Sequence, residues 1–187
     1  LTYCDSSAAP GLSDWIEQLV AESTGKNEVG RLPVVIESSM AAAGGDAFSI
    51  AFSGDADLVI TGELGEQFFL WEWVTALVGA ALEIDPFNQP NVTEAKEATS
   101  ALLAEWNGVL PEFTADAIDG AVEIFGAGSD LTVALRNFIN EIPAGGYVAV
   151  MAYLDRSGDR DLAKLREIIA RKSNRPVTFG WGPRFLH

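Results

Sequence analysis

The chain has 187 residues, of which 48% are apolar and 21% charged, a composition typical of globular proteins and far from that of disordered chains. This length predicts a single domain over residues 1–187. The formal net charge of −15 argues against a nucleic-acid-binding protein, because such proteins gain much of their affinity by neutralising phosphates. The single cysteine, Cys4, excludes an intrachain disulfide and a cysteine-ligated zinc site.

The charge is unevenly distributed along the chain. Residues 156–187 hold eight of the twelve Lys and Arg residues and three acidic residues, a net charge of +5, so residues 1–155 carry −20. A solvated basic helix on an acidic body explains this distribution. The alternative is that the basic end faces an anionic ligand or a partner surface.

The first third of the chain is predicted to alternate between helix and strand. A helix is expected from Gly11 to Gly25, with Ser13 as its N-cap. Its apolar residues recur with helical spacing, at Leu12, Trp15, Ile16, Leu19 and Val20. Extended segments are expected at 32–37, 47–52 and 57–61, and the last contains a continuous Leu-Val-Ile run typical of a buried parallel strand.

The segment 64–82 is predicted to be the most apolar helix. Its longest apolar run, residues 68–82, is too short for a membrane span and contains the charged residue Glu72. Because the helix is apolar all round, it is expected to lie in the core, with both Trp71 and Trp73 buried. Burial against a second subunit or another domain is the alternative.

The rest of the chain continues the alternation. Helices are expected at 92–106, 129–141 and 159–172, and strands at 121–125, 147–154 and 177–179. Asn91 and Ser129 stand where N-caps belong, and Glu94 completes a capping-box pattern with Asn91. In the first of these helices, Ala95, Thr99, Leu102 and Trp106 mark the expected buried face. The alternation predicts an α/β fold class, a three-layer α/β/α sandwich with a parallel sheet.

The residue inventory narrows the possible chemistry. One Cys and one His are too few for a conventional zinc site. A Mg²⁺ site made of carboxylates alone stays possible, but no spacing suggests it, so neither a metal nor a cofactor is expected. The glycine-rich stretches lack a Walker lysine and the Gly-x-Gly-x-x-Gly spacing, and no serine stands in a Gly-x-Ser-x-Gly turn. General acid–base chemistry by carboxylate, lysine and the single histidine, His187, remains.

Two segments together resemble the signatures of the phosphoglucose isomerase family. Residues 22–26, Glu-Ser-Thr-Gly-Lys, resemble the family's Glu-Ser-x-Gly-Lys loop. Residues 87–96, Phe-Asn-Gln-Pro-Asn-Val-Thr-Glu-Ala-Lys, resemble the second signature, Phe-Asp-Gln-x-Gly-Val-Glu-x-x-Lys, and depart from it at Asn88, Asn91 and Thr93. In this order on α/β crossovers, the two segments are a specific indication of the family.

The resemblance covers most of the chain but only the second of the family's two sugar-isomerase domains. Residues 182–187 are similar to the close of the short-form branch, whose members are sometimes fused to a transaldolase. The resemblance implies a domain truncated at both ends, without the N-terminal sugar-isomerase domain and inactive alone, and the absence of an initiator methionine at Leu1 fits this. It implies a cytoplasmic, homodimeric enzyme of glycolysis and gluconeogenesis in carbohydrate metabolism, binding a sugar phosphate and neither nucleic acid nor membrane.

The resemblance also implies the reaction and its catalytic residues. The family interconverts glucose 6-phosphate and fructose 6-phosphate through an enediol. Glu22 would move a proton between C2 and C1, and partial burial at the edge of its helix suits that role. Many larger family members open the sugar ring with a histidine where this chain has Gln67. Lys96 and His187 are therefore expected to share ring opening, and the alternative is that the protein does not assist this step in the same way.

The remaining candidates are substrate-binding residues. Lys26, Gln89 and Arg184 are expected to contact the sugar phosphate. Residue by residue, ordinary surface roles stay open: Glu22 as a solvated helix-end glutamate, and Lys96 as an exposed lysine paired with a neighbouring glutamate. Two alternatives to an enzyme also stay open, a non-catalytic sugar-phosphate-binding domain of the same fold and a dimerisation domain.

Overall fold

The computed structural model describes residues 1–38, 40–126 and 128–182. Contacts group the chain into two compact units, where the sequence pattern suggests one. The first unit comprises Leu1–Thr93 and Val148–His187, and the second comprises Glu94–Tyr147. Within the described ranges, no helix combines the length and apolarity that a membrane crossing requires.

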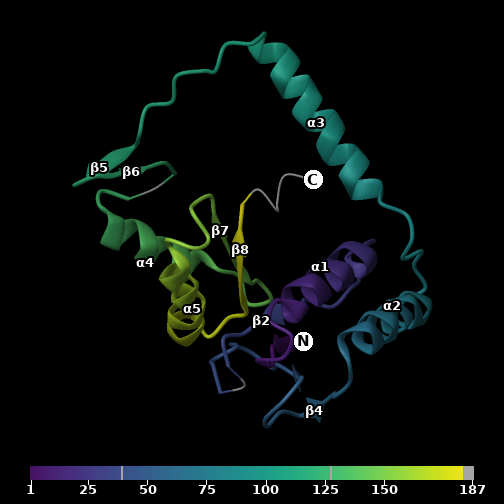
Figure 1. The fold of residues 1–187 in the computed structure, drawn as a ribbon. Helices are drawn as coiled ribbons and strands as arrows, with labels where there is room; N and C mark the ends of the chain where they lie inside the picture. The colour runs from purple at the N-terminus through teal and green to yellow at the C-terminus, as the bar shows by residue number, and fades with distance from the viewer. Residues whose placement is uncertain (39, 127, 183–187) are drawn as a thin grey trace. The chain divides into compact units, whose positions relative to one another are not determined.

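The first unit is built on a four-stranded parallel sheet. Its strands are β1 (Thr2–Cys4), β2 (Val34–Val35), β3 (Ser49–Ala51) and β4 (Leu58–Val59), in the order β2-β1-β3-β4 (Figure 1). Each pairing is parallel, as the alternation of strands and helices predicts. The prediction that β4 is a buried strand is wrong, because this strand lies at the sheet edge and both its residues are exposed.

A second parallel pair belongs to the same unit. β7 (Val148–Ala152) pairs with β8 (Val177–Trp181), and β8 is in contact with β2. Between the two strands the chain forms a 3₁₀-helix, η1 (Arg160–Lys164), and then α5 (Leu165–Ser173). The single helix predicted over 159–172 therefore begins with a tighter 3₁₀ turn, which is common at helix N-termini. Parallel strands with helical crossovers show that the chain has α/β character.

Helix α1 (Leu12–Thr24) lies within the predicted range, Gly11 to Gly25, but has a different cap. The Asp5 carboxylate, in the loop after β1, accepts hydrogen bonds from the backbone N–H groups of Gly11 and Ser13, the latter at 2.7 Å. The prediction of Ser13 as the cap is wrong, since Ser13 lies inside the helix and is fully buried. The cap comes from the preceding strand–helix loop, so the start of α1 is tied to the end of β1.

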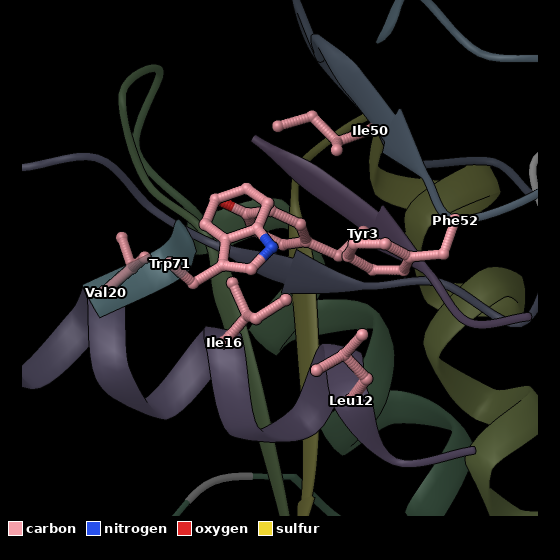
Figure 2. Packing of buried hydrophobic residues seen from close by; sticks show 7 residues of the cluster. All are labelled: Tyr3, Leu12, Ile16, Val20, Ile50, Phe52 and Trp71. Carbon is pink, nitrogen blue, oxygen red and sulfur yellow. The ribbon is translucent and has the colours of Figure 1, made fainter. Parts of the chain in front are cut away.

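The core of the first unit lies between the sheet and the helices α1 and α2 (Leu64–Ala81). Figure 2 shows the side chains of Leu12, Ile16 and Val20 projecting from α1 to the side where Trp71 of α2, Tyr3 and Phe52 lie. Trp71 packs edge to face against Tyr3 of β1, with ring centroids 5.4 Å apart. Such aromatic pairs bury large apolar areas, so this contact joins α2 to the middle of the sheet.

Helix α2 is buried on one face only. Its buried residues, Gln67, Trp71, Thr75 and Gly79, recur every four residues. Trp73 is 56% exposed and Leu77 is 62% exposed, whereas Trp71 is 3% exposed. The prediction of a helix buried all round, with both tryptophans in the core, is therefore wrong, because a uniformly apolar sequence does not determine which face is covered. The helix begins with a capping box between Glu63 and Glu66, which the sequence analysis did not anticipate.

Helix α3 (Pro90–Trp106) leads from the first unit into the second. It begins at Pro90, one residue before the predicted cap Asn91, in agreement with the preference of proline for the first turn. The expected buried face is not found, since no residue of α3 is buried. Lys96 therefore lies on a helix that is solvent-exposed within its unit.

The second unit continues with a hairpin and a helix. β5 (Ala117–Asp119) and β6 (Val122–Ile124) pair antiparallel, so the predicted strand at 121–125 has a partner that the sequence analysis missed and is not parallel. Helix α4 (Leu131–Glu141) is capped by Asp130, whose carboxylate accepts from the Val133 N–H at 2.9 Å. The predicted cap, Ser129, is one residue too early.

Candidate functional site

Glu22 lies in the last turn of α1. Its side chain is partly buried, as predicted, and its Oε1 accepts a hydrogen bond from Gln18 Nε2 at 2.9 Å. The helix ends at Gly25, whose N–H donates to the carbonyl of Ala21 at 2.9 Å. A Cβ at Gly25 would lie 2.8 Å from that carbonyl oxygen, so glycine is required for this ending. The order Glu-Ser-Thr-Gly thus places a carboxylate just before a sharp helix end.

The loop after α1 is tightly folded. Asn27 and Glu28 both have left-handed backbone angles, with φ of 54° and 60°. The Val29 N–H donates to the Lys26 carbonyl at 3.0 Å, and a Cβ at Gly30 would come within 2.8 Å of the Thr24 carbonyl oxygen. Two consecutive left-handed residues store strain that surrounding contacts must offset.

The loop after α2 folds back on its own helix. The Ile84 N–H donates to the Gly79 carbonyl at 3.0 Å, and Phe87 N–H donates to the Asp85 carboxylate at 2.9 Å. The ring of Pro86 occupies the space where a Cβ at Gly79 would lie, 2.7 Å from the proline Cγ. Gly79 is therefore required for the close packing of this loop on α2.

Lys26 joins these two loops. Its side chain is 5% exposed, and its Nζ donates to the Asp85 carbonyl at 2.8 Å and to the Asn88 carbonyl. The contacts join residues 59 and 62 positions apart within the first unit. The two segments that carry the sequence resemblance, 22–26 and the beginning of 87–96, are thereby in direct contact.

The structure places the other predicted site residues as follows. Gln89 is exposed and follows Asn88 directly, beside the Lys26 contact along the chain. Lys96 is exposed and belongs to the second unit. Arg184 and His187 lie outside the described residues. The Lys26 ammonium donates to main-chain carbonyls. These contacts do not test substrate binding by Lys26, Gln89 and Arg184, which stays a prediction.

Gln67 is buried rather than open to a substrate. It is 3% exposed and shares the buried face of α2 with Trp71. Its Oε1 has no hydrogen-bond partner within the described part of the chain. A side chain on this face packs against the core, so Gln67 is badly placed to replace a ring-opening histidine.

A charged pair that the sequence analysis missed connects α5 to the loop after β2. Arg166 is 1% exposed and forms a bidentate ion pair with Glu37, with N–O distances of 2.8 and 2.6 Å. Its third contact is with the Ala42 carbonyl at 3.0 Å. No local sequence signal marks a pair 129 positions apart. The bidentate pair with Glu37 and the bond to the Ala42 carbonyl together supply the hydrogen bonds and the counter-charge that a buried guanidinium requires.

Other basic residues of the C-terminal segment also have acidic partners. Arg171 pairs with Glu167 on α5, Lys164 with Asp161 at 2.8 Å, and Arg156 with Asp14 of α1 at 3.3 Å. These pairs support the interpretation of a solvated basic segment on an acidic body. They do not require an anionic ligand.

Several carboxyl groups have pKa values below the ordinary range because they accept hydrogen bonds. Hydrogen bonds from the Ser49 backbone and hydroxyl lower the pKa of Asp57, and the backbone N–H groups of Gly158 and Ser157 lower that of Asp155. The Arg171 guanidinium and the Ala42 N–H lower the pKa of Glu167. These groups stabilise turns and a helix face. No cluster of three or more His, Cys, Asp or Glu side chains in the described ranges is arranged to hold a metal ion.

Comparison with protein-family models, curated proteins and solved structures finds no match to this chain.

Proposed function

We propose that the chain is a sugar-isomerase domain, with a three-layer α/β/α architecture, that takes part in the interconversion of glucose 6-phosphate and fructose 6-phosphate. The contact from Lys26 to the carbonyls of Asp85 and Asn88 carries the proposal. It joins the two segments that resemble the family signatures, although some 60 residues of chain separate them. A cytoplasmic, homodimeric enzyme of carbohydrate metabolism belongs to the same proposal.

Glu22 acts as the base in this proposal. With the aldehyde form of the substrate, the carboxylate takes the proton from C2, and the C2–H electron pair forms the C1–C2 double bond of an enediolate. The C1 carbonyl oxygen becomes the enediolate oxygen, which receives the proton that the C2 hydroxyl gives up. Return of the proton from Glu22 to C1, with formation of the C2 carbonyl, gives the ketose. Partial burial and the hydrogen bond from Gln18 support this role, because they restrict the carboxylate and limit its access to water.

Lys96 and His187 share ring opening in the proposal. The burial of Gln67 supports the assignment of that step to other residues. Lys96→Ala should lower kcat more with cyclic substrate than with substrate supplied in the open-chain form, and His187→Asn should do the same. Equal losses with both forms for both variants would reject this assignment.

The substitution Glu22→Gln tests the base. In the protein at its natural full length, we expect kcat for glucose 6-phosphate to fall by about 10²–10⁴-fold with KM little changed, because glutamine keeps the size of the side chain and cannot accept the proton. Glu28→Gln, an exposed glutamate in the following loop, is the matched control and should leave kcat unchanged. Retention of half of kcat by Glu22→Gln would refute the role of Glu22.

One observation favours a second candidate, a dimerisation domain. Phe69, Trp73 and Leu77 recur every four residues on α2 and are all more than half exposed, at 65%, 56% and 62%. An apolar stripe of this kind is typical of an interaction surface. Sedimentation would detect a dimer that Trp73→Glu dissociates. If sedimentation shows that the wild-type protein stays monomeric at every protein concentration measured, the dimerisation domain is excluded.

A further inference from the structure

Lys26 is a buried cation whose hydrogen bonds go to main-chain carbonyls. An ammonium is costly to bury unless its N–H donors find acceptors, and here the Nζ donates to the carbonyls of Asp85 and Asn88. Its neighbours on the chain, Asn27 and Glu28, adopt left-handed backbone angles, and the loop folds back so that Gly30 lies close to Thr24 at the end of α1. The tight loop and the two acceptors together define one position for this side chain.

The loop that accepts these bonds is held from two directions. Pro86 packs in the space above Gly79 and holds the loop against α2. Lys26 holds the carbonyls of Asp85 and Asn88 against the end of α1. Because Gln89 and the first turn of α3 follow Asn88 immediately, the Lys26 contact fixes where this part of the chain begins relative to the helix that carries Glu22.

We propose that Lys26 is a positioning residue, whose ammonium holds loop 85–88 against the end of α1 and so orients Gln89 and the start of α3 toward the substrate of Glu22. This inference rests on the proposed function and changes the role of Lys26 from a phosphate ligand to a contact between loops. Misplacement of a reacting or binding group by about 1 Å is enough to cost on the order of 10²-fold in rate.

The test combines amide hydrogen exchange with steady-state kinetics on the protein at its natural full length. Lys26→Met keeps the length of the side chain and removes the donors. We expect amides in 83–89 to exchange at least about tenfold faster, with those of β1 unchanged, because only the loop loses its contacts. We also expect kcat for glucose 6-phosphate to fall by about 10–100-fold, with KM changed less than about threefold.

Two further variants complete the design. Lys26→Arg keeps donors and charge, so we expect it to recover most of the exchange protection and at least about a tenth of kcat, and it remains informative if Lys26→Met does not fold. Arg31→Met removes an exposed cation of the loop after α1, whose side chain donates to the carbonyl of its neighbour Gly30, and should change neither quantity.

Each remaining outcome decides the proposal. The proposal is overturned if amide exchange at 83–89 is unchanged in Lys26→Met. It is also overturned if Lys26→Arg loses activity while its amide exchange at 83–89 stays as in the wild type. A raised KM with unchanged kcat would show instead that Lys26 binds the phosphate group. If the wild-type protein has no isomerase activity, the proposed function fails and the catalytic part of this inference with it, whereas the exchange result still decides whether Lys26 holds the loop.

Discussion

The two units bury their apolar side chains to very different extents. In the first unit, Tyr3, Ile16 and Trp71 belong to a cluster that joins the sheet to α1 and α2. In the second unit, Ile124 is the only buried apolar residue among those described. Yet α4 has as clear an apolar stripe as α1, with Leu135 and Phe138 about half exposed. The difference teaches that periodicity determines which residues share a face, whereas burial depends on a second element that covers it.

The largest expected effect comes from a matched pair of core and surface truncations. Trp71→Ala should lower the free energy of unfolding by about 3–5 kcal/mol, because it leaves a cavity between α1, α2 and Tyr3. Phe138→Ala, in the second unit, should change it by less than about 0.5 kcal/mol, because that side chain is 53% exposed. Urea unfolding measures both. Equal losses would show that the two units do not differ in packing as described.

A smaller and asymmetric effect is expected for the ion pair of the first unit. Glu37→Ala leaves the Arg166 guanidinium buried without its counter-charge and should cost about 3 kcal/mol. Arg166→Met leaves a carboxylate whose side chain is already 32% exposed and can be hydrated, so about 1–2 kcal/mol is expected. The same unfolding experiment compares the two variants. A larger loss for Arg166→Met would contradict the view that burial of the arginine determines the cost.

Native-state hydrogen exchange separates the two units without any substitution. Amides of α1 should be protected at least about tenfold more than those of α4, because buried side chains must separate before α1 opens. α2, with one buried face, should resemble α1. Protection of α4 equal to that of α1 would show that the apolar stripe of the second unit is covered in solution.

The smallest expected effect is a pH dependence at the edge of the first sheet. Because the Ser49 hydrogen bonds lower the pKa of Asp57 in the folded state, the stability they contribute is present above the ordinary carboxyl pKa, about 4, and is lost as the pH falls through the lowered value. Ser49→Ala removes the hydroxyl donor and keeps the backbone N–H donor, so it should destabilise the protein slightly at pH 7 and make stability depend somewhat less on pH below about 4. Urea midpoints at several pH values test this. Parallel pH profiles for variant and wild type would argue against a contribution of the hydrogen bond from the Ser49 hydroxyl to Asp57.

The sequence predicts the helices more reliably than their ends and partners. The range of α1 follows from its apolar spacing and from Gly25, whereas that of α2 follows from its long apolar run. The cap of α1 could not be predicted, because it comes from Asp5. The Asp5 carboxylate accepts a hydrogen bond from the N–H group of Ser13, eight residues later in the chain. β5 was missed because its three residues include an aspartate and a small alanine, which are weak strand signals.

In the candidate site, too, the sequence predicts local features but not contacts between distant segments. Both segments that resemble the isomerase signatures are visible in the sequence, and so is the glycine that ends the helix of Glu22. That Lys26 holds loop 85–88 is not visible, because no local pattern encodes a contact between a side chain and carbonyls about 60 positions away. The exposed face of α2 likewise depends on tertiary packing, since its composition is apolar on every side.

The most direct test of proton transfer by Glu22 is solvent deuterium incorporation. Proton transfer through an enediol lets the proton on the base exchange with water, so in D₂O the wild-type protein at its natural full length should place deuterium at C2 of glucose 6-phosphate and at C1 of fructose 6-phosphate, measured by mass spectrometry. Glu22→Gln should lower the rate of incorporation by at least about 100-fold. Incorporation by Glu22→Gln at the wild-type rate would contradict the assignment of Glu22 as the base.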